Sequence, residues 1–278
     1  MPRLPVSDTV TSPPRSNSDL RPPSGWLKLL ESRAVCELGA MIVASPWLRR
    51  LPRGDGHAVM VFPGMAANDL TTAPLRKFLD DLGYVSRAWG QGLNFGPRKG
   101  VLEKCAADVR DLSRRHRGPV SLIGWSLGGL YAREIAKQLP GQTRCVITLG
   151  TPFAGHPGAT NAWRTFEFLS GQTARDPAIL AGLRAPPSAP TTSIYSRTDG
   201  IVAWQCSLND PGPRVENIEV YASHLGMAVN PLAFYAIADR LAQPEGAWRP
   251  FEPSGLRRFF FQTGQTGQTD IEPPSATA

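Results

Sequence analysis

The residue that organises this sequence is a serine between glycines, in the run GWSLG at positions 124–128 with Ser126 at its centre. A short apolar run at 120–125 leads into it, and apolar residues at helical spacing follow it as far as Leu139. This order predicts a sharp turn from a strand into a helix, where only glycine fits beside the crowded backbone. Such a turn exposes the serine hydroxyl at the positive end of the helix, which suits a nucleophile.

A serine nucleophile needs a base that takes its proton and an acid that orients the base. In an open α/β sheet these groups follow the carboxyl ends of strands. Asp199 comes just after a predicted strand at 192–196, where Gly200 lets the loop turn, and His224 comes just after a predicted strand at 218–222. Because the order serine, aspartate, histidine accompanies such a turn, we expect Ser126, Asp199 and His224 to form a catalytic triad.

Each partner of the serine has a competitor. His156 also follows the carboxyl end of a predicted strand, whereas His57 begins a strand and belongs to the opposite edge of the sheet. Asp210 lies farther from a strand end than Asp199, within a turn signal. These positions favour Asp199 and His224, and they place His156 near the entrance of the site.

Acyl transfer puts negative charge on the former carbonyl oxygen, and two backbone N–H groups must stabilise it. Leu127, the residue after the serine, is expected to supply one donor. Met65 is expected to supply the other, from the loop that follows a predicted strand at 57–63. In that loop Pro63 has no N–H, and Gly64 lets the chain turn the next amide inward.

These motifs resemble the α/β-hydrolase superfamily over roughly residues 55–242. The run LGTPFAG at 149–155 looks like a loop of bacterial lipases, so the resemblance implies a lipase- or esterase-like serine hydrolase. It also implies an acyl-enzyme and no cofactor. One difference from these relatives stands out: the oxyanion loop reads Pro-Gly-Met rather than containing a His-Gly pair. A serine instead of an aspartate at position 126 argues against the haloalkane dehalogenases.

Strand and helix signals alternate along the chain, which predicts an α/β fold with a mostly parallel central sheet flanked by helices. The further strands are expected at 84–89, 120–125 and 144–149, and the helices at 71–82, 101–117 and 230–241. The segment 153–190 interrupts this alternation and is rich in proline and glycine. We expect a small inserted cap there, with a long crossover helix as the alternative.

Length and composition predict one domain. The 278 residues, 41% of them hydrophobic, suffice for a large α/β domain, expected at 25–261. The segments 1–24 and 262–278 are rich in proline, serine or repeated polar residues and are expected to be disordered. The first 25 residues contain no apolar core of a secretory signal, and no run reaches the roughly 18 apolar residues of a membrane span. We therefore expect a cytoplasmic protein.

Charge and metal-ligand residues point to few partners. The net charge is +7, but no basic cluster is interleaved with aromatic residues, so nucleic-acid binding is not expected. The four cysteines lie far apart without metal-ligand spacing, so no metal is expected.

Apolar residues at 26, 29, 30, 34, 38, 41 and 42 predict a helix over 26–47. It either packs on the domain surface or lies on a membrane, which would make the protein peripheral there.

Together these residues favour a serine hydrolase that cleaves carboxylic esters of small molecules or lipids. Trp125, Phe153 and Trp204 are expected to line the substrate pocket, with plain packing as the alternative for both tryptophans. An acyltransferase that uses the same acyl-enzyme is the alternative function, followed by a non-catalytic binding protein of the same fold. The sequence leaves the acyl chain, the alcohol part and the oligomeric state open.

Overall fold

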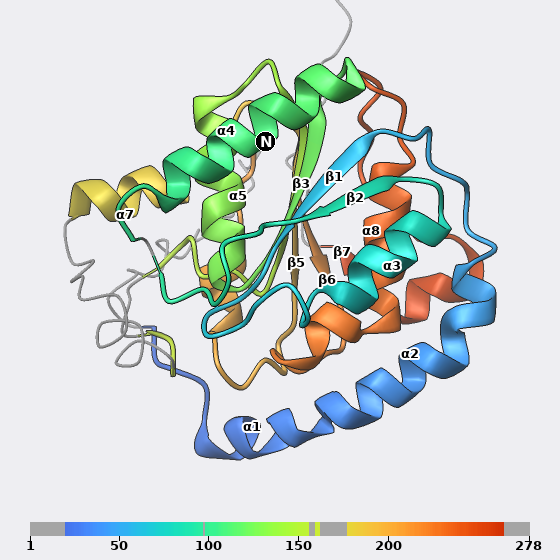
Figure 1. The fold of residues 1–278 in the computed structure, drawn as a ribbon. Coiled ribbons are helices and arrows are strands. Elements are labelled where there is room, and N and C mark those ends of the chain that lie inside the picture. Colours follow the sequence, from blue (N-terminus) through green and yellow to red (C-terminus); the bar gives the residue numbers. More distant parts are fainter. Residues whose placement is uncertain (1–19, 97, 156–158, 162–176, 264–278) are drawn as a thin grey trace, which may run out of the picture.

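The fold is built on one twisted sheet with helices on both faces (Figure 1). The computed structural model describes residues 20–96, 98–155, 159–161 and 177–263. The strands lie in the spatial order β2-β1-β3-β4-β5-β6-β7; β1 to β6 are parallel, and the short β7 pairs antiparallel with β6. The chain direction across the sheet reverses between β1 and β3. Sites of open α/β sheets form beyond the carboxyl ends of strands at such a switch point.

The observed elements follow the expected alternation. The strands are β1 (Ala58–Phe62), β2 (Val85–Ala88), β3 (Val120–Trp125), β4 (Thr143–Leu149), β5 (Thr191–Tyr195), β6 (Val215–Glu219) and β7 (Gln262–Thr263). The helices are α1 (Gly25–Leu29), η2 (Leu30–Arg33), α2 (Ala34–Leu48), α3 (Ala73–Asp81), α4 (Val101–His116), α5 (Leu127–Gln138), α7 (Pro177–Arg184), η4 (Trp204–Ser207), η5 (Gly226–Val229), α8 (Pro231–Leu241) and η6 (Gly255–Phe259). The expected α/β architecture is therefore confirmed.

Alternate residues along the strands fill two separate layers of core, because successive side chains point to opposite faces. On one face, Val59 and Val61 of β1 pack with α3 and α8. On the other face, Met60 and Phe62 pack with α4 and α5. Figure 1 shows the two helix pairs on opposite sides of the sheet. Both faces of β1 are thus covered, and this is why this strand is apolar throughout.

β6 lies earlier in the chain than expected, at Val215–Glu219 rather than 218–222. The buried carboxylate of Glu216 accepts hydrogen bonds from Arg240 Nη1 at 3.0 Å and from the backbone N–H of Phe251 at 2.7 Å. The side-chain oxygen of Asn217 accepts one from the backbone N–H of Asn209 at 2.8 Å. Because these partners satisfy the polar groups, the strand tolerates residues that an apolar pattern does not reveal. The loop 220–223 therefore separates β6 from His224.

The expected helix over 26–47 is present as the consecutive elements α1, η2 and α2, which we call the N-terminal arm (residues 25–48). Figure 1 shows the arm along the outside of the domain, beyond the carboxyl edge of the sheet. It packs on the domain through Met41, Ala44 and Leu48, but most of the apolar stripe is exposed. Trp26 and Ile42 are 68% exposed, whereas Glu31 is 5% exposed. A buried carboxylate needs hydrogen-bond donors, and those of Glu31 lie in the candidate site.

The ends of the domain and its cap are described in part. Leu20 packs beside Val202, and the pair of residues that forms β7 falls in the expected C-terminal tail, so the domain extends past 25–261 at both ends. Within the expected cap, Thr160 bridges to Val202 and α7 follows, while 156–158 and 162–176 lie outside the described residues. The rest of the expected tails, 1–19 and 264–278, also lies outside them. None of the described helices combines the length and the apolar character that crossing a bilayer demands.

Candidate active site

Ser126 occupies the sharp turn between β3 and α5. Its backbone angles, φ 52° and ψ −123°, are unfavourable for a residue with a Cβ. The neighbouring strand holds it there, because the N–H of Ser126 donates to the carbonyl oxygen of Leu149 at 2.8 Å. Strain of this kind persists only where surrounding structure imposes it, and it gathers at functional sites. The turn that the sequence predicts is therefore confirmed.

The glycines of the motif allow three backbones to meet at this turn. A Cβ on Gly124 would lie 2.3 Å from the Cα of Gly129, and a Cβ on Gly128 would lie 2.3 Å from the carbonyl oxygen of Phe62. Both distances are far below van der Waals contact. The end of β3, the start of α5 and the loop after β1 consequently touch one another without intervening side chains.

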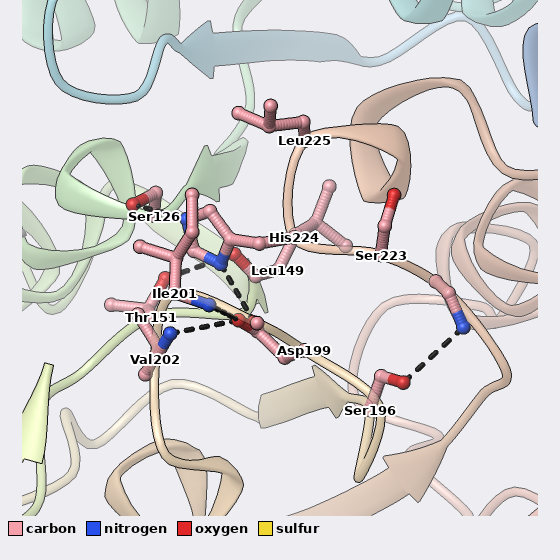
Figure 2. A network of polar contacts seen from close by, with 12 residues as sticks. Ser126, Leu149, Thr151, Ser196, Asp199, Ile201, Val202, Ser223, His224 and Leu225 are labelled. Atoms are coloured by element: carbon pink, nitrogen blue, oxygen red, sulfur yellow. Dashed lines mark hydrogen bonds and ion pairs between the residues drawn. The ribbon is translucent and has the colours of Figure 1, made fainter. Parts of the chain in front are cut away.

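Three side chains from separate strand ends converge at the serine (Figure 2). Nε2 of His224 lies 2.9 Å from Oγ of Ser126, and Nδ1 of His224 lies 2.7 Å from Oδ2 of Asp199. His224 and Asp199 are each 3% exposed, whereas Ser126 is half-buried. The hydroxyl is therefore the most accessible member of a hydrogen-bonded chain that ends in a buried carboxylate.

The carboxylate of Asp199 is fixed by its own loop. Its Oδ1 accepts hydrogen bonds from the backbone N–H groups of Ile201 and Val202, both at 2.8 Å, as Figure 2 shows. This leaves Oδ2 to accept from His224. With Nδ1 of His224 as the donor, Nε2 presents its lone pair to the serine, which is the tautomer of a general base.

The charge balance around His224 favours its protonated form. Burial alone would lower the pKa of His224, but the charge of Asp199, its hydrogen bond and the charge of Glu31 outweigh burial. The pKa of His224 is therefore raised above its ordinary value of 6.5. An imidazole with a raised pKa is a stronger base for the serine proton.

Glu31 of the N-terminal arm holds both loops that carry the acid and the base. Its Oε1 accepts from the backbone N–H groups of Gly200 at 2.7 Å and His224 at 3.0 Å, and its Oε2 accepts from Leu225 at 2.9 Å. One side chain thus connects the residue after Asp199 to His224 itself.

Two further polar residues of the arm reach the same loops. Oε1 of Glu37 accepts from the backbone N–H of Ser223 at 2.7 Å, and its Oε2 accepts from Nδ2 of Asn230 at 2.9 Å. Nη2 of Arg33 donates to the carbonyl oxygen and to the hydroxyl of Thr198, both at 2.7 Å. The sequence analysis missed all three arm residues, because it read this segment by its apolar stripe.

Gly200 has a different role from the one expected. Its φ is not among the positive values of the chain, so no special turn requires glycine there. A Cβ on Gly200 would instead lie 2.2 Å from the carbonyl oxygen of Leu27 in α1. A Cβ on Gly226 would likewise lie 2.4 Å from Oε2 of Glu37. Both glycines let the N-terminal arm approach the loops closely.

The two expected oxyanion donors belong to two segments that meet at the serine, the start of α5 and the loop after β1. Leu127 begins α5, where the first N–H groups have no acceptor within the helix. Met65 follows Gly64, and a Cβ on Gly64 would lie 3.3 Å from Cβ of Ser126. Among the described residues, neither amide donates a backbone hydrogen bond outside the regular elements.

Asn94, in the loop after β2, supports the oxyanion loop and was missed by the sequence analysis. Its side-chain Nδ2 donates to the carbonyl oxygen of Pro63 at 2.8 Å. Its backbone carbonyl accepts from Ala66 at 2.7 Å, and its N–H donates to the carbonyl of Ala67 at 2.8 Å. The glycine-rich run around this completely buried residue reads as an ordinary loop in sequence, so only its position in space reveals it.

The expected pocket residues differ in their surroundings. Nε1 of Trp125 donates to the carbonyl oxygen of His224 at 3.0 Å, so this side chain contacts the triad loop. Phe153 is buried under the guanidinium of Arg133, whose Cζ lies 3.8 Å from the ring centroid. Trp204 stacks on Tyr195, with ring centroids 5.8 Å apart. The contacts described for Phe153 and Trp204 are thus packing contacts.

The competitors of the triad residues fall elsewhere. Asp210 accepts from Nε of Arg184 at 2.7 Å, on the surface. His156 lies outside the described residues. His57 is at the amino edge of the sheet, where it lies 2.5 Å from Asp55 and 2.8 Å from Oγ of Ser121. In the described ranges, no three His, Cys, Asp or Glu side chains gather where a metal ion could bind.

Comparisons with known proteins support the fold. Neither protein-family models nor curated protein sequences give a match. The structure is similar to lipase B of Aspergillus fumigatus, with 21% identity, a TM-score of 0.51 and coverage of 71% of this chain and 56% of that chain. A pyrethroid hydrolase of Sphingobium faniae shows 20% identity, a TM-score of 0.49 and coverage of 68% and 98%. The chain thus has the α/β-hydrolase fold, and it spans just over half the length of the lipase.

Proposed function

We propose that this protein is a serine hydrolase that cleaves carboxylic esters through an acyl-enzyme. The observation that carries the proposal is the unbroken hydrogen-bonded chain from Ser126 through His224 to Asp199, with steps of 2.9 Å and 2.7 Å. It lies at the switch point of the sheet, on a strained turn that faces the start of a helix. These are the geometric requirements of an activated serine nucleophile.

In the first half of the reaction, His224 takes the proton of Ser126 as its Oγ attacks the ester carbonyl carbon. Asp199 stabilises the resulting imidazolium. The N–H groups of Leu127 and Met65 donate to the oxyanion that forms at the carbonyl oxygen. The tetrahedral intermediate then collapses, His224 gives the proton to the leaving alcohol, and an acyl-serine remains.

In the second half, His224 accepts a proton from water while the water oxygen attacks the acyl carbon. A second tetrahedral intermediate forms in the same oxyanion hole and releases the acid. His224 returns the proton to Ser126, so the enzyme ends unchanged. No step calls for a cofactor.

An uncharged ester of a small molecule or a lipid fits the surroundings best. Leu225, the residue after His224, is 47% exposed, and the ring of Trp125 lies 6.1 Å from the ring of His224, centroid to centroid. Apolar groups at the rim favour an apolar acyl or alcohol part over a charged one. Such a substrate agrees with the lipase- or esterase-like hydrolase that the sequence predicts.

Hydrolysis of a short p-nitrophenyl ester by the wild type and by Ser126→Ala tests the proposal. We expect the substitution to abolish the enzymatic rate while the circular dichroism spectrum stays the same. Wild-type turnover by the Ala variant would contradict the proposal. Product analysis with a competing alcohol should give free acid as the main product; mainly transesterified product would instead identify an acyltransferase.

A further inference from the structure

The N-terminal arm turns two carboxylates toward the domain and most of its large apolar side chains outward, although Leu48 is buried in the core and Met41 packs against that core. Its inward carboxylates, Glu31 and Glu37, are its only acidic residues. Glu31 is buried against the loops of the acid and the base, where it accepts three backbone N–H bonds between 2.7 Å and 3.0 Å. A buried carboxylate is costly unless it is satisfied in this way. Packing alone does not call for a charge at this position.

We propose that Glu31 is a positioning residue of the active site, which fixes His224 relative to Asp199 and adds negative charge beside the imidazole. The proposal rests on the hydrolase function given above. It assigns to a segment far from the triad in sequence the task of joining the two loops that the sheet leaves separate. Leu225 and Gly200, the other residues bound by Glu31, follow the base and the acid directly in the chain.

The charged groups around His224 support this role. Asp199 faces the ring from the loop after β5, and Glu31 faces the backbone of His224 from η2. Glu37 binds the preceding residue, but Arg33 lies 3.4 Å from its carboxylate and offsets its charge. Of the two arm carboxylates, Glu31 alone contributes to the raised pKa of His224. It should therefore stabilise the imidazolium that forms when Ser126 loses its proton.

Glu31→Gln separates charge from shape. The Gln oxygen can keep the two bonds of Oε1, to Gly200 and His224, while its NH2 group meets the N–H of Leu225 and loses that bond. Glu37→Gln is the matched control, because it removes a carboxylate from the same face of the arm whose charge a neighbouring cation already offsets. Both variants should fold, since each keeps most of its hydrogen bonds.

The measurement is the NMR titration of the imidazoles in the full chain, which contains four histidines. We expect the pKa of His224 to fall by about one in Glu31→Gln and to stay near the wild-type value in Glu37→Gln. In parallel, kcat for ester hydrolysis should fall about tenfold in Glu31→Gln, with KM nearly unchanged. An unchanged pKa of His224 in Glu31→Gln, or an equal fall in both variants, would overturn the proposal.

The titration is independent of turnover, so the two proposals can fail separately. If the wild type does not hydrolyse esters but the pKa of His224 responds to Glu31→Gln, the assignment of Glu31 stands and the proposed reaction fails. If the wild type hydrolyses esters and neither readout responds, the reaction stands and the assignment of Glu31 fails.

A separate observation concerns the outward side of the same arm. Its exposed large apolar residues are Trp26, Leu29, Val35, Leu38, Ile42, Val43 and Trp47, between 42% and 76% exposed. Both carboxylates between residues 20 and 54 are turned inward, with Glu31 buried and the side chain of Glu37 12% exposed. The exposed charges of this stretch are all basic, at Arg21, Lys28, Arg49, Arg50 and Arg53. Arg49 lies 3.6 Å from the carboxylate of Asp81 and Arg53 donates to the carbonyl oxygen of Asp81 at 2.8 Å, which leaves Arg21, Lys28 and Arg50 as the outward cations. The outer surface is thus apolar and cationic.

We infer that this surface docks on an anionic lipid bilayer. Apolar side chains of such a helix insert at the boundary of headgroups and acyl chains, and flanking cations pair with anionic lipids. A second copy of this chain would present the same positive charges to itself, so charge complementarity favours the bilayer. Docking would place the lipid surface on the arm that supports the active-site loops.

Co-sedimentation of the full chain with vesicles tests this inference. We expect binding to vesicles of phosphatidylcholine with phosphatidylglycerol, weaker binding in high salt, and loss of binding in the double variant Ile42→Gln/Val43→Gln. Phe259→Gln, which changes an 84% exposed residue outside the arm, should bind like the wild type. Absence of wild-type binding to anionic vesicles, or a solution dimer that the double variant dissociates, would overturn it.

Discussion

Two serine–histidine–aspartate arrangements lie at opposite edges of one sheet. At the carboxyl edge, His224 lies 2.9 Å from Ser126 and 2.7 Å from its aspartate. At the amino edge, His57 lies 2.8 Å from Ser121 and 2.5 Å from its aspartate. We call the second set, Ser121, His57 and Asp55, the amino-edge network. By residue type and distance the two are nearly the same.

The serines differ in backbone and access. Ser126 lies on a strained turn at the start of α5 and is half-buried. Ser121 lies within strand β3, where the pairing with β4 is irregular between Val120 and Leu122, and it is completely buried. No substrate carbonyl can reach a hydroxyl that is buried inside a covered sheet. The serine of the amino-edge network is therefore structural.

The acids and bases differ as well. The side chain of Asp55 is 52% exposed and also pairs with Arg144 at 2.7 Å, so its charge is shared and partly solvated. Burial, the largest effect there, lowers the pKa of His57, whereas the pKa of His224 is raised. The comparison shows that environment, rather than residue type and spacing, decides which arrangement suits catalysis.

The largest contrast should come from removing each serine. Ser126→Ala should lower kcat/KM for a p-nitrophenyl ester by at least about 10⁴-fold, because the nucleophile is lost. Ser121→Ala should leave kcat/KM within about threefold and cost about 1 to 2 kcal/mol of unfolding free energy, since it removes the hydrogen bonds of this hydroxyl to His57 and Cys145. Steady-state kinetics and urea unfolding measure the two quantities. A comparable loss of activity in both variants would break the contrast.

Removing each acid should give the next largest difference. Asp199→Asn should lower kcat by about 10³- to 10⁴-fold, because the amide favours the wrong tautomer of His224. Asp55→Asn should leave kcat nearly unchanged and cost about 1 kcal/mol, because the carboxylate of its ion pair with Arg144 is half exposed. The same kinetic and unfolding measurements apply, and an active Asp199→Asn enzyme would count against the triad.

The two histidines should titrate on opposite sides of 6.5, their ordinary pKa. Hydrolysis needs His224 neutral, and its pKa is raised, so kcat/KM should fall as the pH drops through a midpoint above 6.5. His57, with its lowered pKa, should stay neutral to a pH below 6.5. A pH–rate profile and histidine NMR measure these midpoints. An acid limb with its midpoint below 6.5 would remove the assigned base from the mechanism.

The smallest expected effect concerns the oxyanion loop, for which the amino-edge network has no counterpart among the described residues. Asn94→Ala removes the hydrogen bond from Nδ2 to the carbonyl oxygen of Pro63 and loosens the loop that carries Met65. We expect about a tenfold loss of kcat with little change in KM, because a donor for the transition state is displaced. An unaltered kcat would show that the loop does not need this support.

The elbow could be predicted from sequence because local chemistry determines it. The glycines at 124 and 128, the apolar strand before Ser126 and the helical pattern after it lie within one short stretch. Asp199 and His224 could be predicted to lie near it, because each follows a strand of a parallel sheet. Sites of open α/β sheets form beyond the carboxyl ends of strands, and this rule predicts that both residues lie near Ser126.

What held the acid and base loops could not be predicted, because it depends on contacts between distant segments. The arm was interpreted from its apolar stripe, yet Glu31 faces inward and most of the stripe is exposed. The sequence predicts β6 too late in the chain, because a strand that contains Glu216 does not look like a core strand. The structure buries Glu216 there, since its carboxylate accepts a hydrogen bond from Arg240. Gly200 was interpreted as a residue that lets the loop turn. Glycine is needed there for another reason, because the backbone of Leu27 occupies the space that a Cβ would fill. Each of these depends on a partner that pattern and propensity do not identify.

The most direct test of the central claim is to react the protein with a fluorophosphonate and to locate the adduct by peptide mass spectrometry. The account predicts a single adduct on Ser126 in the wild type, much slower labelling in His224→Ala, and no labelling in Ser126→Ala. An adduct on another residue, or an unlabelled wild-type protein, would contradict the claim that Ser126 is the activated nucleophile.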